Sequence, residues 1–319
     1  MSKTLPEREG LYVWRTRRDA DSPSWASDIV RDVRAAEIND LFIKVANANY
    51  AYNAHEDSAD LEFIFSSLRG ETNLWGWHYI YLNDPIGEAK IARRMIEKWD
   101  LAGYVINAEG HTKGKDANAL TFMRKLRDMV GSDYPLGLSS YRYPNYHPTL
   151  PWKVFLGGED RVDFNAPQVY WLKQQNSVEQ IDLTIKRTKA HEAFIGVDHV
   201  PIHPILCAFS DNPHEWKPKE TSMIDAFQHC KEIGLTSVSW YEWVASHKIN
   251  RWDVIQNYTD WEGAPEPPPQ DDTPYTQEDL EEAYYNGYVE GWKERKEAIS
   301  KRIFGEQEMD VTFPSSDSQ

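Results

Sequence analysis

The chain has 319 residues, of which 40% are hydrophobic, 13% aromatic and 27% charged. This apolar share is enough to bury a core, so a disordered or collagen-like chain is excluded. The formal net charge of −16 argues against a nucleic-acid partner, because nucleic-acid binding needs a cationic surface that displaces counterions.

Targeting and redox signals in the sequence are sparse. The apolar runs are short, and none approaches the roughly 20 residues that a bilayer requires, so we expect no membrane insertion. The first residues, MSKTLPE, lack the apolar core of a signal peptide, and we expect none. Cys207 and Cys230 provide neither a disulfide framework nor a zinc-binding spacing, so we expect no metal and no cofactor.

Eight short apolar runs rich in β-forming residues alternate with amphipathic segments. The expected strands are residues 10–15, 41–46, 75–81, 103–108, 136–140, 167–172, 202–209 and 237–243. The expected helices are residues 24–36, 60–68, 87–99, 117–130, 177–191 and 221–233, and the poorest helical pattern is residues 147–160.

This alternation predicts an α/β fold. Eight strand–helix units over roughly 250 residues are typical of a (β/α)8 TIM barrel. A doubly wound open sheet is the alternative, but it needs a glycine-rich turn after its first strand, which residues 10–15 (GLYVWR) do not supply. We therefore expect residues 1–262 to form a barrel whose chemistry lies at the carboxyl ends of its strands.

The composition changes once, after the expected barrel. Residues 263–275 are rich in proline and acidic residues, which indicates a linker. Thr276 and Asp279 resemble a capping box at the start of an amphipathic helix over 276–305, and 306–319 should be disordered. The helix could pack on the barrel, bind a protein partner or mediate self-association.

The fourth expected strand ends in a carboxylate. Period-two alternation places Val105, Asn107 and Glu109 on one face. If this face points inward, Glu109 lies at the catalytic rim, where aromatic surroundings would suit it to be a general acid. The alternative is a solvated glutamate that opens the next loop.

The eighth expected strand also ends in a carboxylate. Alternation places Val238, Trp240 and Glu242 on one face. Two carboxyl groups that flank a sugar bond can serve as acid and as nucleophile or base, so Glu242 is a candidate catalytic partner of Glu109. The alternative is an ion pair between Glu242 and Arg251 or Arg142.

Aromatic residues are abundant, with 13 Trp and 17 Tyr, and their rings can stack on sugars or fill a core. Lys44 lies within an expected strand, so its ammonium must be paired, for example with Glu109, or lie at the barrel rim. The candidate substrate contacts are Lys44, Trp77, Tyr79, Tyr141, Arg142, Gln168, Tyr170 and Trp240. Asp198, His199 and His203 form a short cluster that we interpret as a rigid turn rather than a metal site.

The order of motifs resembles the family 25 glycoside hydrolases, which are lysozyme-like barrels that cleave peptidoglycan. Residues 41–46 (LFIKVA) look like their second strand and residues 75–79 (WGWHY) like their third. Residues 107–109 (NAE) fall where that family has Asp-x-Glu, whose glutamate is the catalytic acid. Residues 168–171 (QVYW) and 240–243 (WYEW) also look like family 18 chitinase-like barrels.

Two departures from the family 25 pattern affect the implied mechanism. The first strand lacks the family's aspartate, and Asn107 replaces the aspartate of the fourth strand. Glu242 or another acid could take the role of the missing aspartates. Alternatively, the N-acetyl oxygen of the substrate itself could act as the nucleophile, with Asn107 or Tyr170 orienting it. The third outcome is a barrel that binds glycan without cutting it.

The resemblance therefore implies a glycosidase acting on an N-acetylated glycan, foremost bacterial peptidoglycan, in the manner of a lysozyme or endolysin. The alternative is an inactive carbohydrate-binding or structural module of a phage particle or similar assembly, and a third is a barrel enzyme of another class. The expected location is the cytoplasm, or a virion, or the medium after lysis.

Overall fold

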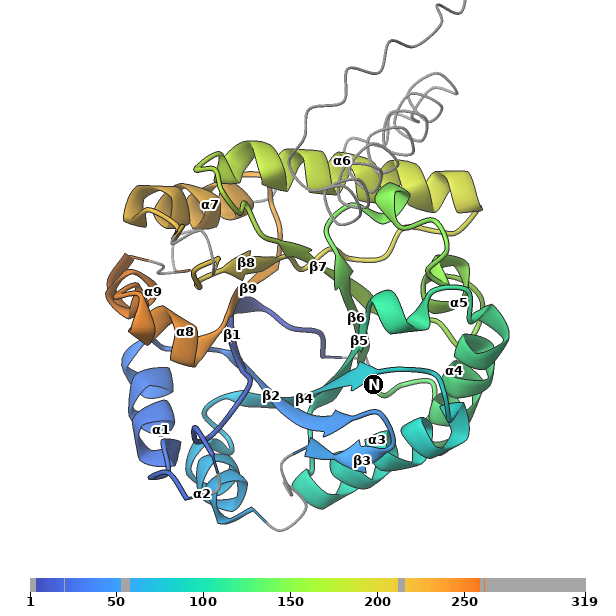
Figure 1. Ribbon diagram of the computed structural model, residues 1–319, viewed down its shortest axis with the longest axis horizontal. Coiled ribbons are helices and arrows are strands. Elements are labelled where there is room, and N and C mark those ends of the chain that lie inside the picture. Colours follow the sequence, from blue (N-terminus) through green and yellow to red (C-terminus); the bar gives the residue numbers. More distant parts are fainter. Residues whose placement is uncertain (1–3, 20, 53–57, 212–215, 259–260, 262–319) are drawn as a thin grey trace, which may run out of the picture.

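The computed structural model describes residues 4–19, 21–52, 58–211, 216–258 and 261, which form a closed parallel barrel inside a layer of helices (Figure 1). The sheet runs β1-β9-β8-β7-β6-β5-β4-β2, and β1 also pairs with β2, which closes the ring. The predicted (β/α)8 TIM barrel is confirmed. The expected linker, helix 276–305 and tail lie outside the described residues.

The strands are close to the predicted ones. They are β1 (Arg8–Val13), β2 (Asp40–Asn47), β4 (Asn73–Ile80), β5 (Gly103–Ala108), β6 (Leu136–Tyr141), β7 (Phe164–Val169), β8 (Ile205–Cys207) and β9 (Ser237–Tyr241). The sequence did not predict β3 (Tyr50–Ala51), which pairs antiparallel with the end of β2.

Helices cover the outside of the barrel (Figure 1). They are α1 (Ala26–Ala35), α2 (Ala59–Leu68), α3 (Pro85–Trp99), α4 (Asp116–Val130), α5 (Trp152–Leu156), α6 (Ser177–Ile195), α7 (Glu220–Glu232), α8 (Trp243–Lys248) and α9 (Trp252–Tyr258). The segment with the poorest helical pattern, residues 147–160, contains the five-residue helix α5. No helix within the described ranges is long and apolar enough to cross a bilayer.

Below the pocket described later, large aromatic rings in the barrel interior pack directly against glycines of neighbouring strands. A Cβ atom on Gly103 would lie 1.9 Å from the ring of Trp75, and one on Gly137 would lie 2.2 Å from Phe164. The strands therefore place bare backbone where a neighbour projects a large ring, as close packing of a barrel interior requires. This packing fills the lower interior, and the pocket described below lies above it.

Asp40 is a buried carboxyl group in this lower layer. It accepts hydrogen bonds from the Glu7 N–H at 2.9 Å and from Trp75 Nε1 at 2.7 Å. Burial nevertheless raises the pKa of Asp40 from 3.8 to about 7, and the hydrogen bonds offset only part of this effect.

We expect Asp40→Asn to change how stability depends on pH. The folded protein holds the Asp40 proton to a higher pH than the unfolded chain, so the free energy of unfolding falls as pH rises from about 4 to 7. The wild type should therefore lose roughly 2–3 kcal/mol relative to Asp40→Asn between pH 5 and 8, as measured by chemical denaturation. Asp128→Asn, at an exposed site on α4, is the control. Parallel pH profiles for wild type and Asp40→Asn would contradict the assignment.

Candidate active site

A pocket of about 230 Å³ opens at the carboxyl ends of the barrel strands. It is lined by Tyr12, Trp77, Asn107, Glu109, Ser139, Gln168, Tyr170, Ile205 and Tyr241. In barrels of this kind the strand ends and the loops that follow them carry the catalytic residues. The sequence predicted five of these residues, namely Trp77, Asn107, Glu109, Gln168 and Tyr170.

Glu109 follows directly after β5 and lies in the pocket, on the face that alternation predicted. The side-chain amide of Gln168 donates a hydrogen bond to Glu109 Oε1 at 2.9 Å. The same nitrogen lies 3.5 Å from Asn107 Oδ1 and 3.4 Å from Ser139 Oγ. Gln168 therefore holds one oxygen of the carboxylate in place from across the pocket. Within the described residues, Glu109 is the only carboxylate among the pocket-lining side chains.

Three tyrosines, Tyr12, Tyr170 and Tyr241, line the same pocket as this carboxylate. Burial raises the pKa of Tyr170 and of Tyr241, and the charge of Glu109 adds to the effect in both. Their rings lie 6.0 Å apart, with Tyr12 beside Tyr241 at 6.1 Å. These hydroxyl groups keep their protons at neutral pH, so they remain available as hydrogen-bond donors to a ligand.

Aromatic side chains also form the rim above Glu109. Tyr79 and His111 share a hydrogen bond of 3.0 Å between the hydroxyl oxygen and Nδ1. Tyr141 stacks on His147 with ring centroids 3.7 Å apart. Burial, and then the charge of Glu109, raises the pKa of both Tyr79 and Tyr141. The predicted contacts Tyr79 and Tyr141 thus lie at the rim, next to the pocket-lining residues.

Lys44 lies behind one wall of the pocket. Its Nζ is 4.9 Å from the ring centroid of Trp77, which lines the pocket, and 5.8 Å from that of Tyr79. Burial and then the charge of Arg15 lower the pKa of Lys44 to about 8, although the charge of Glu109 acts in the opposite direction. The charge of Glu109 thus favours the protonated form of Lys44, as a pairing of the two would, but its effect on the pKa is smaller than that of burial.

Three further predicted residues, Trp240, Arg142 and Glu242, are not among the lining residues and have other roles. Trp240 faces the helices: its Nε1 donates to Glu9 Oε1 at 2.6 Å, and its ring stacks near Phe227. The predicted inward face of this strand is therefore wrong, because Tyr241 points inward instead. Arg142 donates to the carbonyl oxygen of Tyr170 at 2.5 Å and lies over the ring of its neighbour Tyr143.

Glu242 has a local structural role. Its carboxylate accepts hydrogen bonds from the backbone N–H groups of Val244 at 3.3 Å and Ala245 at 2.8 Å, which caps α8. Neither expected ion pair explains its place, since Arg251 pairs with Glu220 at 3.0 Å. Nothing in this geometry makes Glu242 a partner of Glu109.

The sequence analysis missed four pocket residues, namely Tyr12, Ser139, Ile205 and Tyr241. Tyr12 stacks on Phe42 at 4.6 Å inside the barrel, and alternation along the first strand could have identified it. The two histidines near residue 200 have separate partners: His199 pairs with Glu192 at 2.6 Å, and buried His203 stacks on Phe164. Among the residues described, no cluster of three potential metal ligands is found.

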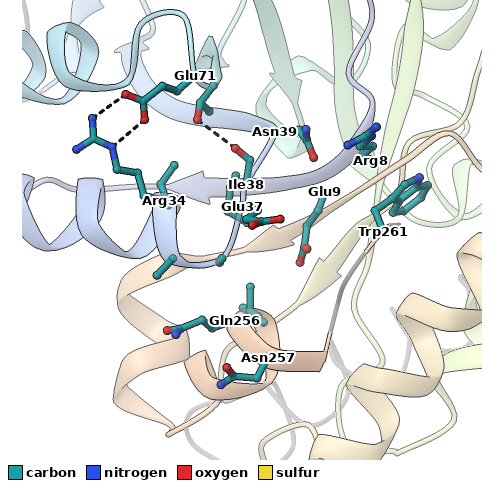
Figure 2. Close-up of a pocket in the computed structure, with 15 residues that line it drawn as sticks. Arg8, Glu9, Arg34, Glu37, Ile38, Asn39, Glu71, Gln256, Asn257 and Trp261 are labelled. Carbon is teal, nitrogen blue, oxygen red and sulfur yellow. Dashed lines mark hydrogen bonds and ion pairs between the residues drawn. The ribbon is translucent and has the colours of Figure 1, made fainter. Parts of the chain in front are cut away.

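A larger pocket, of about 680 Å³, lies at the opposite end of the barrel between α1 and α9 (Figure 2). Three of its charged side chains have partners, since Arg34 Nε lies 2.8 Å from Glu71 Oε2 and Glu9 accepts a hydrogen bond from Trp240 Nε1. This is the amino-terminal face, where barrel enzymes place stabilising rather than catalytic residues. We therefore assign the candidate active site to the smaller pocket.

The chain matches no family model and no curated protein sequence. Its structure is similar to a putative chitinase A from Streptomyces coelicolor, with a TM-score of 0.56, 11% identity, and 79% of this chain and 98% of that chain covered. It is also similar to the spore cortex-lytic enzyme SleL of Bacillus cereus, with a TM-score of 0.56, 11% identity, and 79% of this chain and 74% of that chain covered. A third similar structure is a fungal endo-β-N-acetylglucosaminidase of glycosyl hydrolase family 18, with a TM-score of 0.53, 10% identity, and 79% of this chain and 98% of that chain covered.

These similarities support the fold alone, a (β/α)8 barrel like that of these three proteins. One of the three is a family 18 enzyme, and the expected resemblance to that family is confirmed only for the barrel fold. The family 25 part stays a prediction.

Proposed function

We propose that this protein is a glycosidase that hydrolyses an N-acetylated glycan, with Glu109 as the general acid. The observation that carries the proposal is the placement of Glu109, held by Gln168 in an aromatic pocket at the carboxyl ends of the strands. The similar structures include a chitinase and a spore cortex-lytic enzyme, which supports a polymer of N-acetylated sugars such as chitin or bacterial peptidoglycan.

The mechanism must work with the one carboxylate that the described pocket provides. We propose that Glu109 protonates the leaving oxygen while the carbonyl oxygen of the sugar's own N-acetyl group attacks carbon 1. The bond to the leaving sugar breaks and a cyclic oxazolinium ion forms. Water then adds to carbon 1, Glu109 takes its proton, and the ring reopens to the N-acetyl sugar.

In this scheme Asn107 orients the N-acetyl group. Its side chain lies next to Gln168 and lines the pocket, so its amide can hydrogen-bond the acetamide. An amide carries no charge, so it stabilises the positive oxazolinium less than an aspartate would. Tyr170 and Tyr241 are further donors toward the same group.

We expect substitutions of Asn107 to separate orientation from charge. Asn107→Ala should lower kcat about 10–100-fold, because the acetamide loses a partner that aligns it for attack. Asn107→Asp should retain or raise kcat and move the acidic side of the pH profile, because a second carboxylate beside Glu109 alters the pKa values of the pair. The measurement is kcat against pH on a chitin oligomer. An unchanged kcat in Asn107→Ala would remove Asn107 from the mechanism.

The direct test is the release of new reducing ends from chitin oligomers and from purified peptidoglycan by the full chain. Turnover of either polymer supports the proposal. Binding without turnover would favour the alternative, a carbohydrate-binding barrel, to which the lack of a second carboxylate in the described pocket also points. If the chain neither bound nor cleaved either polymer, the proposed function and the alternative would both be overturned.

A further inference from the structure

Two cationic side chains lie on the same tryptophan beside the candidate active site. Lys44 Nζ is 5.5 Å from the ring centroid of Trp14, and the Arg15 guanidinium carbon is 5.1 Å from it. Lys44 also lies 4.4 Å from the ring of Tyr52. We call Lys44, Arg15 and Trp14 the cationic wall.

The cationic wall adjoins the pocket. Lys44 contacts the ring of Trp77, and Trp77 lines the pocket. Arg15 joins the same edge through Trp14, because the ring of Trp14 lies against both cations. Arg15 is exposed and Lys44 is only 5% exposed, so the wall extends from solvent to the buried edge of the pocket.

The charge of this wall contrasts with that of the whole protein. The chain carries a net charge of −16, yet two neighbouring cations flank a pocket in which Glu109 is the only carboxylate among the described lining residues. A neutral sugar would offer no charge to this wall. A carboxylate on the sugar would receive charge-assisted hydrogen bonds in a partly desolvated site, where such bonds are strong.

We propose that the cationic wall binds the carboxylate of an acidic sugar next to the N-acetylated sugar that is cleaved. This inference rests on the proposed function and narrows its substrate to an acidic glycan. The carboxylate could belong to the lactyl ether of a muramyl sugar or to a uronic acid, since both present it at the edge of a pyranose ring.

The test compares ligands in the Glu109→Gln background, where turnover is slowed. The probes are a neutral chitin disaccharide, an N-acetylglucosamine–N-acetylmuramic acid disaccharide and a uronic acid–N-acetylglucosamine disaccharide, with Kd measured by calorimetry. At least one acidic probe should bind about tenfold more tightly than the neutral one, and the preferred probe identifies the source of the carboxylate.

Variants of the wall should remove this preference alone. Arg15→Gln should weaken the preferred acidic probe about five- to tenfold and change the neutral probe less than twofold, and Lys44→Met should weaken the acidic probe more than the neutral one. Arg18→Gln, at an exposed arginine of the same loop, is the matched control. Because Arg15 is exposed, its variant tests the wall even if Lys44→Met fails to fold.

The outcomes separate the two proposals. Equal affinity for acidic and neutral probes, or equal losses for both in Arg15→Gln, would overturn the cationic wall and leave the proposed function intact. No binding of any probe, together with no turnover by the wild type, would instead overturn the proposed function.

Discussion

Glu109→Gln is expected to lower kcat on an N-acetylated glycan by about 10³-fold or more, because the glutamine cannot protonate the leaving oxygen. Its carbonyl oxygen can still accept the hydrogen bond that Gln168 donates to Glu109, so the pocket should keep its shape. KM should change little, which distinguishes a lost proton donor from a damaged binding site. The measurement is the initial rate of reducing-end release, with thermal unfolding recorded in parallel.

Glu242→Gln is the matched control for this substitution. Glu242 is likewise a glutamate at the end of a barrel strand, but it is buried and its carboxylate caps α8. Its substitution should cost about 1 kcal/mol of stability or less and leave kcat within twofold. Equal losses of kcat in the two variants would show that Glu109 has no special chemical role.

Gly103→Ala is expected to destabilise the fold by about 3 kcal/mol or more. The new Cβ atom would lie 1.9 Å from the ring of Trp75, and Trp75 cannot easily move, because it is 1% exposed and its Nε1 donates to Asp40. The strain falls in the layer that supports the pocket from below. Chemical denaturation gives the change in stability, and near-UV circular dichroism reports the packing of the tryptophan.

Two further variants identify the cause of this loss. Gly70→Ala meets no heavy atom within 4 Å but has a φ of +85°, so it should show the cost of backbone strain alone, about 1 kcal/mol. Gly103→Ala combined with Trp75→Phe should regain part of the loss, because a smaller ring leaves room for the methyl group. If Gly103→Ala were no more destabilising than Gly70→Ala, the close packing of Gly103 against Trp75 would be refuted.

The strand pattern of the barrel could be predicted because its runs are short, apolar and separated by amphipathic helices. β5 matches the prediction residue for residue, at Gly103–Ala108. β7 was predicted at residues 167–172 but spans Phe164–Val169, so Pro167 lies inside the strand, where proline is uncommon. The hairpin strand β3 and the short helices α8 and α9 depend on contacts that local patterns do not contain.

The candidate site could be predicted where polarity fixed the inward face. Asn107 and Glu109 are polar residues at alternate positions of an apolar strand, and both lie in the pocket. In β9, adjacent Trp240 and Tyr241 are both bulky, so the pattern does not tell which of them points inward. The contact between Gln168 and Glu109 spans 59 positions of the chain, and only the closed barrel reveals it.

The capping role of Glu242 has a consequence for selectivity. Its oxygens are engaged by the first amides of α8, so the end of β9 supplies no nucleophile to a sugar in the pocket. A glycoside that carries a plain hydroxyl at carbon 2, such as a cellulose fragment, would have no internal group to take that place. Under the proposed mechanism the protein would therefore not cleave cellulose, even if a cellulose fragment fitted the aromatic pocket as well as a chitin fragment.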